Sequence, residues 1–311
     1  MKQRIVAFGG GHGLAASLSA LRLVSEQVTA VVTVADDGGS SGRLRQQYDV
    51  LPPGDLRMAL AALCDDSEWG HLWRDVLQHR FEGGGELAGH ALGNLLIMGL
   101  WELLGDTVDG LDLVGRLLGA RGRVLPMSSV PLVITAQVAG LDPKNPRAVT
   151  RVEGQAAVAT TRGQVLSVTL EPPSPPACPE ALTAIHEADH IVLGPGSWYT
   201  SVMPHLLVPE LVQALRHSSA RTILTLNLEM HTSETSGYSA ASHLASLRHH
   251  APGVGIDVVL ADPLVVEDAV AVREQATALG AELVLLPVSR PDDPGKHDPL
   301  RLAAAYRDII G

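Results

Sequence analysis

Two clusters of small and acidic residues near the N-terminus have the composition of a phosphate-binding site. The first is the glycine cluster 9–13, and the second starts at the carboxylates of Asp36 and Asp37. Glycine allows a positive φ and lets backbone N–H groups approach a ligand closely. N–H groups at the start of a helix bind phosphate. The glycine cluster therefore predicts ligand contacts at Gly10, Gly11, His12 and Gly13.

The acidic cluster continues through small residues to Arg43. Asp36 and Asp37 suit three roles, which are binding a ribose hydroxyl, holding Mg²⁺ and capping the next turn. Ser40 and Ser41 add hydroxyl groups to the same stretch. We include all five residues among the predicted ligand contacts. The pattern establishes no cofactor, and Mg²⁺ is the one that the carboxylates would suit.

Four further polar residues could join this site. Asp55 follows Pro52-Pro53-Gly54 and has the position of a helix N-cap, while the fork of donors of Arg57 could reach a phosphate. His90 and Asn94 are four residues apart and would share one helix face. They could bind sugar or base atoms, and a buried histidine with a structural role is the competing interpretation.

A second glycine loop follows an apolar run at 191–193. Small residues and hydroxyl groups there suit a second phosphate loop, although a plain strand-to-helix turn has the same pattern. A polar stretch after another apolar run, with Glu229, His231 and Glu234, would reach the pocket if its strand is central. From these two stretches we predict ligand contacts at Gly194, Gly196, Ser197, Thr200, Ser201 and Asn227.

Apolar periodicity indicates the elements that hold these residues. The runs 5–8 and 28–34 are typical of buried parallel strands, and Leu14, Leu18 and Leu21 recur at helical spacing between them. A right-handed crossover would place both loops at the same carboxyl edge of the sheet. Open α/β sheets bind ligands at that edge.

The whole chain is predicted to form one α/β domain, Rossmann-like and doubly wound, with a mainly parallel sheet, an inserted helical segment and an antiparallel β excursion. Tryptophan and leucine residues at 69–77 are expected in the core, and 132–135, 156–160 and 165–170 are expected to be strands. The predicted segments are 1–57 (first nucleotide-binding half), 58–120 (helical), 121–178 (β excursion and proline-rich linker) and 179–311 (second α/β half).

Composition excludes several classes of protein. The net charge of −11 disfavours nucleic acid as a partner. Two cysteines without a Cys-x-x-Cys pair argue against a disulfide framework or a zinc ribbon. No apolar run approaches the ~20 residues of a membrane span, and no signal sequence is evident, so we expect no membrane insertion and a cytoplasmic location.

Five sequence blocks together resemble the gluconeogenesis factor (YvcK-like) family of the CofD superfamily, which is named for 2-phospho-lactate transferase. His12 departs from the threonine that many relatives have. The resemblance implies a UDP-sugar ligand such as UDP-N-acetylglucosamine, and a role in cell shape and cell-wall synthesis during growth on gluconeogenic carbon. It also implies cell-wall or cell-shape partner proteins, and a homodimer is expected. The blocks are Gly9–Leu14, Thr33–Arg45, Leu51–Arg57, Gly89–Leu95 and Gly194–Ser201.

Other functions remain open at this point. The acidic pair would allow a phosphotransferase like 2-phospho-lactate transferase, whereas a regulator that only binds its ligand needs no catalytic residue. Gly11-x-Gly13-x-x-Ala16 is also compatible with an NAD-dependent oxidoreductase, although no hydride-transfer partner is evident. His186 and His190 spell a zinc-protease motif, but a strand is predicted to begin at His190.

Overall fold

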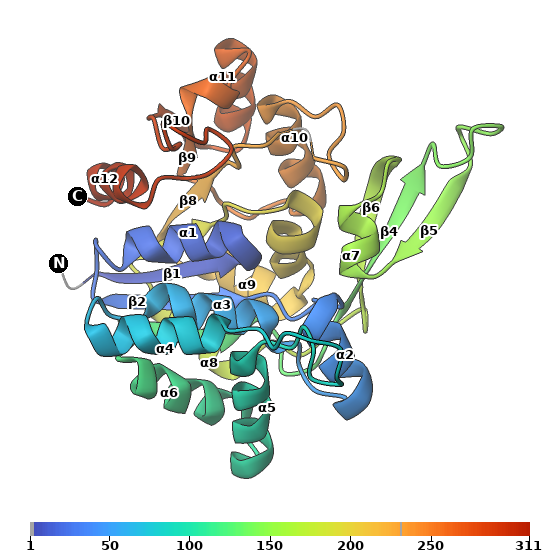
Figure 1. Cartoon of the computed structure of the whole chain (residues 1–311). Helices are drawn as coiled ribbons and strands as arrows, with labels where there is room; N and C mark the ends of the chain where they lie inside the picture. The colour runs from blue at the N-terminus through green and yellow to red at the C-terminus, as the bar shows by residue number, and fades with distance from the viewer. Residues whose placement is uncertain (1–2, 231) are drawn as a thin grey trace.

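The computed structural model describes residues 3–230 and 232–311, and His231 therefore lies outside the described residues. A seven-stranded parallel sheet forms the centre of the fold (Figure 1). Its strands, in spatial order, are β10 (Glu282–Leu285), β9 (Val258–Ala261), β8 (Arg221–Thr225), β7 (His190–Leu193), β1 (Arg4–Gly9), β2 (Gln27–Val32) and β3 (Arg123–Pro126).

Helices cover both faces of this sheet, with α1, α3 and α12 in front of it and α8 and α9 behind it in Figure 1. The helices are α1 (Gly11–Leu21), α2 (Gly39–Tyr48), α3 (Pro53–Leu63), α4 (Glu68–Gln78), α5 (Leu92–Leu104), α6 (Thr107–Leu118), α7 (Gln155–Ala159), α8 (Pro179–Glu187), α9 (Pro209–His217), α10 (Ala240–His250), α11 (Ala269–Ala278) and α12 (Pro299–Ile310). Short turns add η1 (Trp198–Val202, a π-helical turn), η2 (Met203–Leu207) and η3 (Pro263–Val265).

The strand order places the two halves of the chain side by side. β1 pairs in parallel with β2 on one side and with β7 on the other. From β1 the chain winds outwards to β2 and β3, and from β7 it winds outwards to β8, β9 and β10. Such a reversal of winding leaves a crevice beyond the carboxyl ends of the two central strands. The predicted doubly wound α/β fold is confirmed.

A small antiparallel sheet projects from this body (Figure 1) and confirms the predicted β excursion. Its strand order is β5 (Val149–Glu153), β4 (Val133–Ala139) and β6 (Gln164–Glu171). No strand was predicted at β5, because its side chains are nearly all exposed and show no alternation. β3 lies within the segment expected to form the excursion but pairs with β2 in the main sheet.

The strand predicted at 156–160 is wrong, because residues 156–159 belong to helix α7 and Thr160 is its C-cap. Alanine favours a helix, and Gly154, at φ 99°, turns the chain before it. The backbone N–H of Ala156 donates to Asp37 Oδ1 at 2.9 Å, which satisfies one of the first-turn groups of this helix.

Two expectations about side chains have different outcomes. Trp69 and Leu72 were expected in the core but are 54% and 56% exposed, because they lie on the outer side of α4. His186 lies in α8 and His190 begins β7, which confirms the predicted switch from helix to strand within the zinc-protease motif.

Among the described residues, no helix is long and apolar enough to cross a membrane.

The C-terminal helix is held by a buried hydroxyl cluster. The Tyr306 hydroxyl, on α12, lies 2.9 Å from Ser17 Oγ of α1 and 3.0 Å from Thr225 Oγ1 of β8, and the tyrosine is fully buried. This contact joins both halves of the chain beneath the front helices. Losing one partner leaves buried hydroxyl groups unsatisfied, which typically costs about 1–3 kcal/mol.

We predict that Tyr306→Phe lowers the free energy of unfolding by about 1–3 kcal/mol, because Ser17 and Thr225 lose a buried partner. Urea unfolding followed by circular dichroism measures this loss. Tyr48→Phe is the matched control, since Tyr48 is 57% exposed and should change stability little. Equal stability of the two variants would contradict the structural role of the cluster.

Candidate functional site

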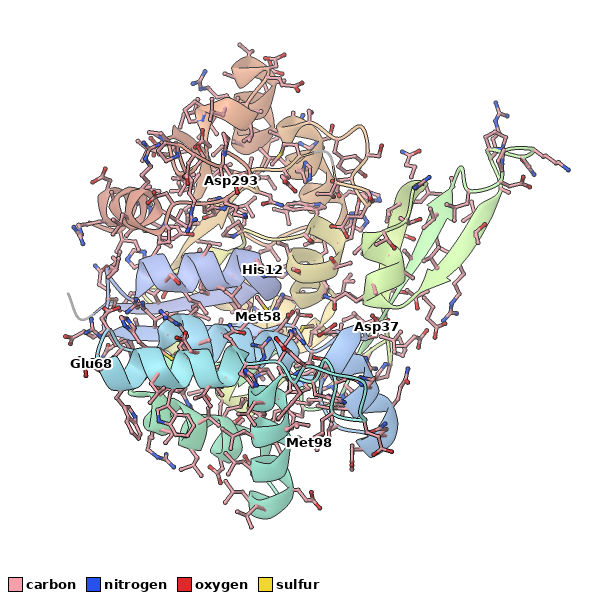
Figure 2. All side chains as sticks on the ribbon, in the orientation of Figure 1. His12, Asp37, Met58, Glu68, Met98 and Asp293 are labelled. Atoms are coloured by element: carbon pink, nitrogen blue, oxygen red, sulfur yellow. The ribbon has the colours of Figure 1, made fainter. Side chains whose placement is uncertain are left out.

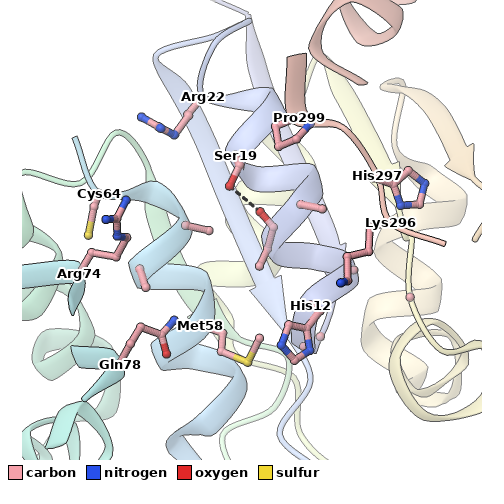
Figure 3. Close-up of a pocket in the computed structure, with 18 of the residues that line it drawn as sticks. His12, Ser19, Arg22, Met58, Cys64, Arg74, Gln78, Lys296, His297 and Pro299 are labelled. Carbon is pink, nitrogen blue, oxygen red and sulfur yellow. Dashed lines mark hydrogen bonds between the residues drawn. The ribbon is translucent and has the colours of Figure 1, made fainter. Parts of the chain in front are cut away.

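A cavity of about 610 Å³ extends along α1 from its N-terminal end, at the carboxyl edge of the main sheet, to Arg22 (Figure 3). In Figure 3, Met58 and Gln78 lie on one side of α1, and Lys296, His297 and Pro299 lie on the other. Eight of the predicted contacts line this cavity. They are Gly10, Gly11, His12, Gly13, Gly196, Ser197, Ser201 and Asn227.

The two glycine loops touch each other at the floor of this site. A Cβ on Gly13 would lie 2.4 Å from the Pro195 carbonyl oxygen and 2.7 Å from Gly196 Cα. A side chain at position 13 would therefore push the two loops apart. Gly11 has room for a Cβ, but its φ of +56° is one that other residues rarely adopt. The sequence predicted backbone approach to a ligand, and the structure adds close packing between loops.

The start of α1 is capped by a carboxylate from another helix. Gly10, its N-cap, has no side chain to accept a hydrogen bond, and the Gly11 N–H donates to the carboxyl of Asp55. Asp55 was predicted as a ligand contact, and the competing interpretation, an N-cap of its own helix, is wrong, because α3 already begins at Pro53. The N–H groups of His12 and Gly13 lie in the first turn, where no helical acceptor reaches them.

Two carboxyl groups near the glycine loop, those of Asp36 and Asp55, interact electrostatically. A Cβ on Gly10 would lie 2.5 Å from Asp55 Oδ2, and one on Gly54 would lie 2.8 Å from Asp36 Oδ2. Burial and then the negative charge of Asp36 raise the pKa of Asp55 to about 7. The hydrogen bond from Gly11 and the positive charge of Arg57 oppose this rise. Asp55 therefore holds a proton over part of the neutral pH range.

A buried chain of hydrogen bonds joins four other predicted residues. Arg57 Nε donates to Asn94 Oδ1 at 2.9 Å, Asn94 Nδ2 donates to Ser40 Oγ at 3.0 Å, and Ser40 Oγ lies 2.9 Å from His90 Nδ1. The predicted shared helix face is wrong, because α5 begins at Leu92 and His90 precedes it. The chain also reaches the cavity, since Arg57 Nη1 donates to Gln78 Oε1.

Burial also lowers the pKa values of two residues in this hydrogen-bonded chain. It lowers the pKa of Arg57 to about 10, and the nearby charge of Arg80 adds to that effect. Burial and then the charge of Arg43 lower the pKa of His90. His90 therefore stays neutral at pH 7, which fits a ring nitrogen that accepts a hydrogen bond from Ser40.

Asp36, Asp55 and the four residues of the hydrogen-bonded chain lie outside the cavity lining, and so do five other predicted contacts, which have structural roles. Arg43 Nη2 donates to the Ala88 carbonyl at 2.8 Å, and Asp37 caps α7. Thr200 is 2% exposed, and its hydroxyl bonds to the buried carboxyl of Glu234. The other two are Ser41, beside Gly54, and Gly194, packed against the Thr225 carbonyl.

Figure 2 shows the separation between the cavity and a residue with a structural role, since His12 and Met58 lie at the centre of the molecule and Asp37 lies towards the small sheet.

The segment 290–299 contributes cavity residues that the sequence analysis missed. It follows the edge strand β10 and returns as a tight loop in which the Arg290 N–H donates to the Lys296 carbonyl at 2.8 Å. Lys296 and His297 thereby reach the α1 side of the sheet. Burial lowers the pKa of His297 to about 4, so this histidine is neutral. The sequence signal for these cavity residues was that segment 290–299 follows a predicted strand and contains proline, glycine and charged residues.

The chain is similar to proteins of one family along nearly its whole length. Residues 5–288 match the family model described as 2-phospho-L-lactate transferase CofD. A Mycobacterium tuberculosis protein named putative gluconeogenesis factor is 54% identical over 312 residues, covering 99% of this chain and 91% of that protein. The gluconeogenesis factor of Bacillus subtilis is 34% identical, covering 99% and 98% of the two chains.

A solved structure shares the fold. The crystal structure of a UPF0052-family protein from Bacillus halodurans superposes with a TM-score of 0.86 at 34% identity, and covers 98% of each chain. Together with the family match, this similarity extends across the helical segment, the β excursion and the second half, where the sequence blocks were sparse.

The raised pKa of Asp55 leads to a prediction about stability and pH. The folded protein retains a proton that the unfolded chain releases near pH 4, so this stabilisation is present below pH 4 and is lost as pH rises towards 7. Asp55→Asn stays neutral and keeps an oxygen for Gly11. Relative to wild type, we expect the variant to gain roughly 2–4 kcal/mol between pH 4 and pH 8, at ~1.4 kcal/mol per pKa unit.

Urea unfolding at a series of pH values measures this difference. Glu234 has a pKa raised to about 7 by burial and titrates in the same window, so Glu234→Gln separates its share. Asp308→Asn, at an exposed position on α12, is the matched control. Parallel pH curves for wild type and Asp55→Asn would show that Asp55 ionises normally.

Proposed function

We propose a function for this chain on the basis that it belongs to the CofD family, among proteins named gluconeogenesis factors. It is a cytoplasmic protein that binds a nucleotide sugar such as UDP-N-acetylglucosamine. It regulates cell shape and cell-wall synthesis during growth on gluconeogenic carbon. The observation that carries the binding part is a single cavity lined by strand-end loops from both halves of the chain.

The cavity has the chemistry that a diphosphate needs. Backbone N–H groups of the first turn of α1 lie at one end, next to the hydroxyl groups of Ser197 and Ser201. His12 and Lys296 flank the same end in Figure 3. Because the protein carries a net charge of −11, phosphate binding has to come from such local donors. Two loops offer more donors than one, and a diphosphate has more oxygens than one loop can satisfy.

The cavity is also large enough for more than a phosphate. At about 610 Å³ it lies in the range of sites for drug-sized ligands. Beyond the phosphate end, α1 and α3 contribute small side chains with Met58, which would accommodate a ring, and charged residues border them. The polar and charged residues that line the far end are Ser19, Arg22, Asp65, Asp66, His71 and Arg74.

The regulatory part of the proposal comes from the resemblance to gluconeogenesis factors. A regulator needs only a ligand-dependent change that a partner protein detects. A two-fold dimer and cell-wall or cell-shape partner proteins complete this proposal.

A phosphotransferase is the second candidate, favoured by the paired carboxyls of Asp36 and Asp55. Among the described residues there is no group of three or more His, Cys, Asp or Glu side chains placed for a metal ion. Mg²⁺ is often held by one or two carboxylates plus substrate phosphates, so this pair suits it, and a bound cation would displace the Asp55 proton. Mg²⁺ would neutralise charge on a transferred phosphoryl group. An NAD-dependent oxidoreductase lacks such a supporting observation.

We predict that UDP-N-acetylglucosamine raises the melting temperature of the wild-type protein in a concentration-dependent way. A ligand present at about 100 times its Kd stabilises the folded state by about 2.7 kcal/mol. NAD and GDP serve as comparison ligands, each with and without Mg²⁺. A larger shift with NAD would contradict the UDP-sugar assignment, and turnover of a nucleotide-activated substrate would favour the transferase.

Gly13→Ala is predicted to abolish UDP-sugar binding, because its Cβ would meet the Pro195 carbonyl at 2.4 Å and separate the two loops. Isothermal titration calorimetry measures binding, and circular dichroism checks that the fold survives. Gly99→Ala is the control, since a Cβ there meets nothing within 4 Å on helix α5. Wild-type affinity in Gly13→Ala would show that the ligand does not depend on the contact between the loops.

A further inference from the structure

We propose that the side-chain amide of Gln78 is a ligand contact, which the buried Arg57 holds so that the Nε2 amino group faces the cavity. The inference rests on the proposed function, because it names a group by which the same cavity would recognise its ligand. Gln78 is the last residue of α4 and lines the cavity. None of the sequence motifs includes it.

The orientation of the amide follows from the chemistry of Arg57. A guanidinium has five N–H donors and no acceptor. Arg57 is 4% exposed, and it donates from Nε to Asn94 Oδ1 and from Nη1 to Gln78 Oε1. Either amide turned around would place its own N–H groups against a buried cation. The carbonyl oxygen of Gln78 must therefore face Arg57.

In the part of the hydrogen-bonded chain beyond Arg57, each group donates to the next one. Asn94 Nδ2 donates to Ser40 Oγ at 3.0 Å, and the Ala91 N–H donates to the same oxygen at 3.4 Å. The hydroxyl hydrogen of Ser40 is then left for His90 Nδ1 at 2.9 Å. Each group has one role along the chain, so Arg57 cannot rotate away without leaving buried acceptors unsatisfied.

With Oε1 occupied, the two N–H donors of Gln78 are what the side chain offers to the cavity. Within the described part of the chain, Nε2 has no hydrogen-bond partner. Figure 3 shows Gln78 beside Met58, across the cavity from Lys296. The charge of Arg57 behind the amide polarises it and strengthens it as a donor. It therefore selects an oxygen acceptor, which in a nucleotide sugar is a phosphoryl oxygen or an oxygen of the sugar or base.

Gln78→Glu and Gln78→Ala test this inference together. The glutamate keeps the shape and gains an ion pair with Arg57 but presents only acceptors, so we expect UDP-N-acetylglucosamine to bind at least about tenfold more weakly. The alanine removes the donors without adding charge, and we expect a loss of several-fold. Gln47→Glu, at an exposed position on α2, adds the same charge elsewhere and should bind like wild type.

Thermal unfolding without ligand tests the orientation separately. If Arg57 faces Gln78, Gln78→Glu should melt higher than Gln47→Glu, and the difference should disappear when Arg57 is also changed to Gln. Calorimetry with UDP-N-acetylglucosamine, UDP and inorganic pyrophosphate locates the acceptor. A loss with all three ligands assigns a phosphoryl oxygen, and a loss with UDP-N-acetylglucosamine alone assigns a sugar oxygen.

Three results would overturn the inference. Wild-type affinity in Gln78→Ala would show that the amide donors are not used, whatever Gln78→Glu does. A Gln78→Glu melting temperature no higher than that of Gln47→Glu would show that Arg57 does not hold the side chain. A wild-type protein that binds none of the three ligands would overturn the proposed function itself, and this inference with it.

Discussion

The site depends on the close approach of two loops that lie far apart in the sequence. Gly13 packs against Pro195 and Gly196, with a Cβ position only 2.4 Å from the Pro195 carbonyl oxygen. This contact is available because β1 and β7 are neighbours in the sheet, so both loops leave the same edge. The cavity, its helix N-terminus and its hydroxyl groups all follow from that adjacency. Small residues here serve packing first, and they make backbone donors accessible as a result.

Buried charge is the second constraint on this region. Asp36, Asp55 and Arg57 lie close together, and two of them are buried enough to shift their pKa values towards the neutral form. In a medium of low polarity such groups persist only when each has hydrogen-bond partners. Asp55 has the Gly11 N–H, and Arg57 has two amide oxygens. Both buried charged groups thus have hydrogen-bond partners within the protein, which keeps their side chains in place before a ligand arrives.

Peripheral segments of the fold contact loops from both halves of the chain near the site. Asp37 accepts the Ala156 N–H at 2.9 Å, and Gln155 Nε2 donates to the Thr200 carbonyl at 3.1 Å. Helix α7 therefore links the small sheet to one loop from each half of the chain. On the opposite side, the 290–299 segment leads into α12, which packs against α1. Segments with no motif of their own therefore surround the motif-bearing loops.

Sequence patterns predicted those features of the fold that depend on local chemistry. Buried β-branched runs predicted the central strands, helical spacing predicted α1, and glycines after strands predicted the carboxyl-edge loops, because each signal depends on neighbouring residues only. The family resemblance also came from such local blocks. Where local signals conflicted with context, prediction failed, as at 156–160, where a β-like run of small residues became α7.

The contacts between distant polar residues in and around the cavity depend on the tertiary structure. It took Asp55 from the start of its own helix to that of α1, joined His90 to Asn94 through Ser40, and brought in Gln78 and Lys296. These partnerships follow from strand order and helix packing. They join residues tens to hundreds of positions apart, and neither composition nor spacing along the chain encodes that distance in space.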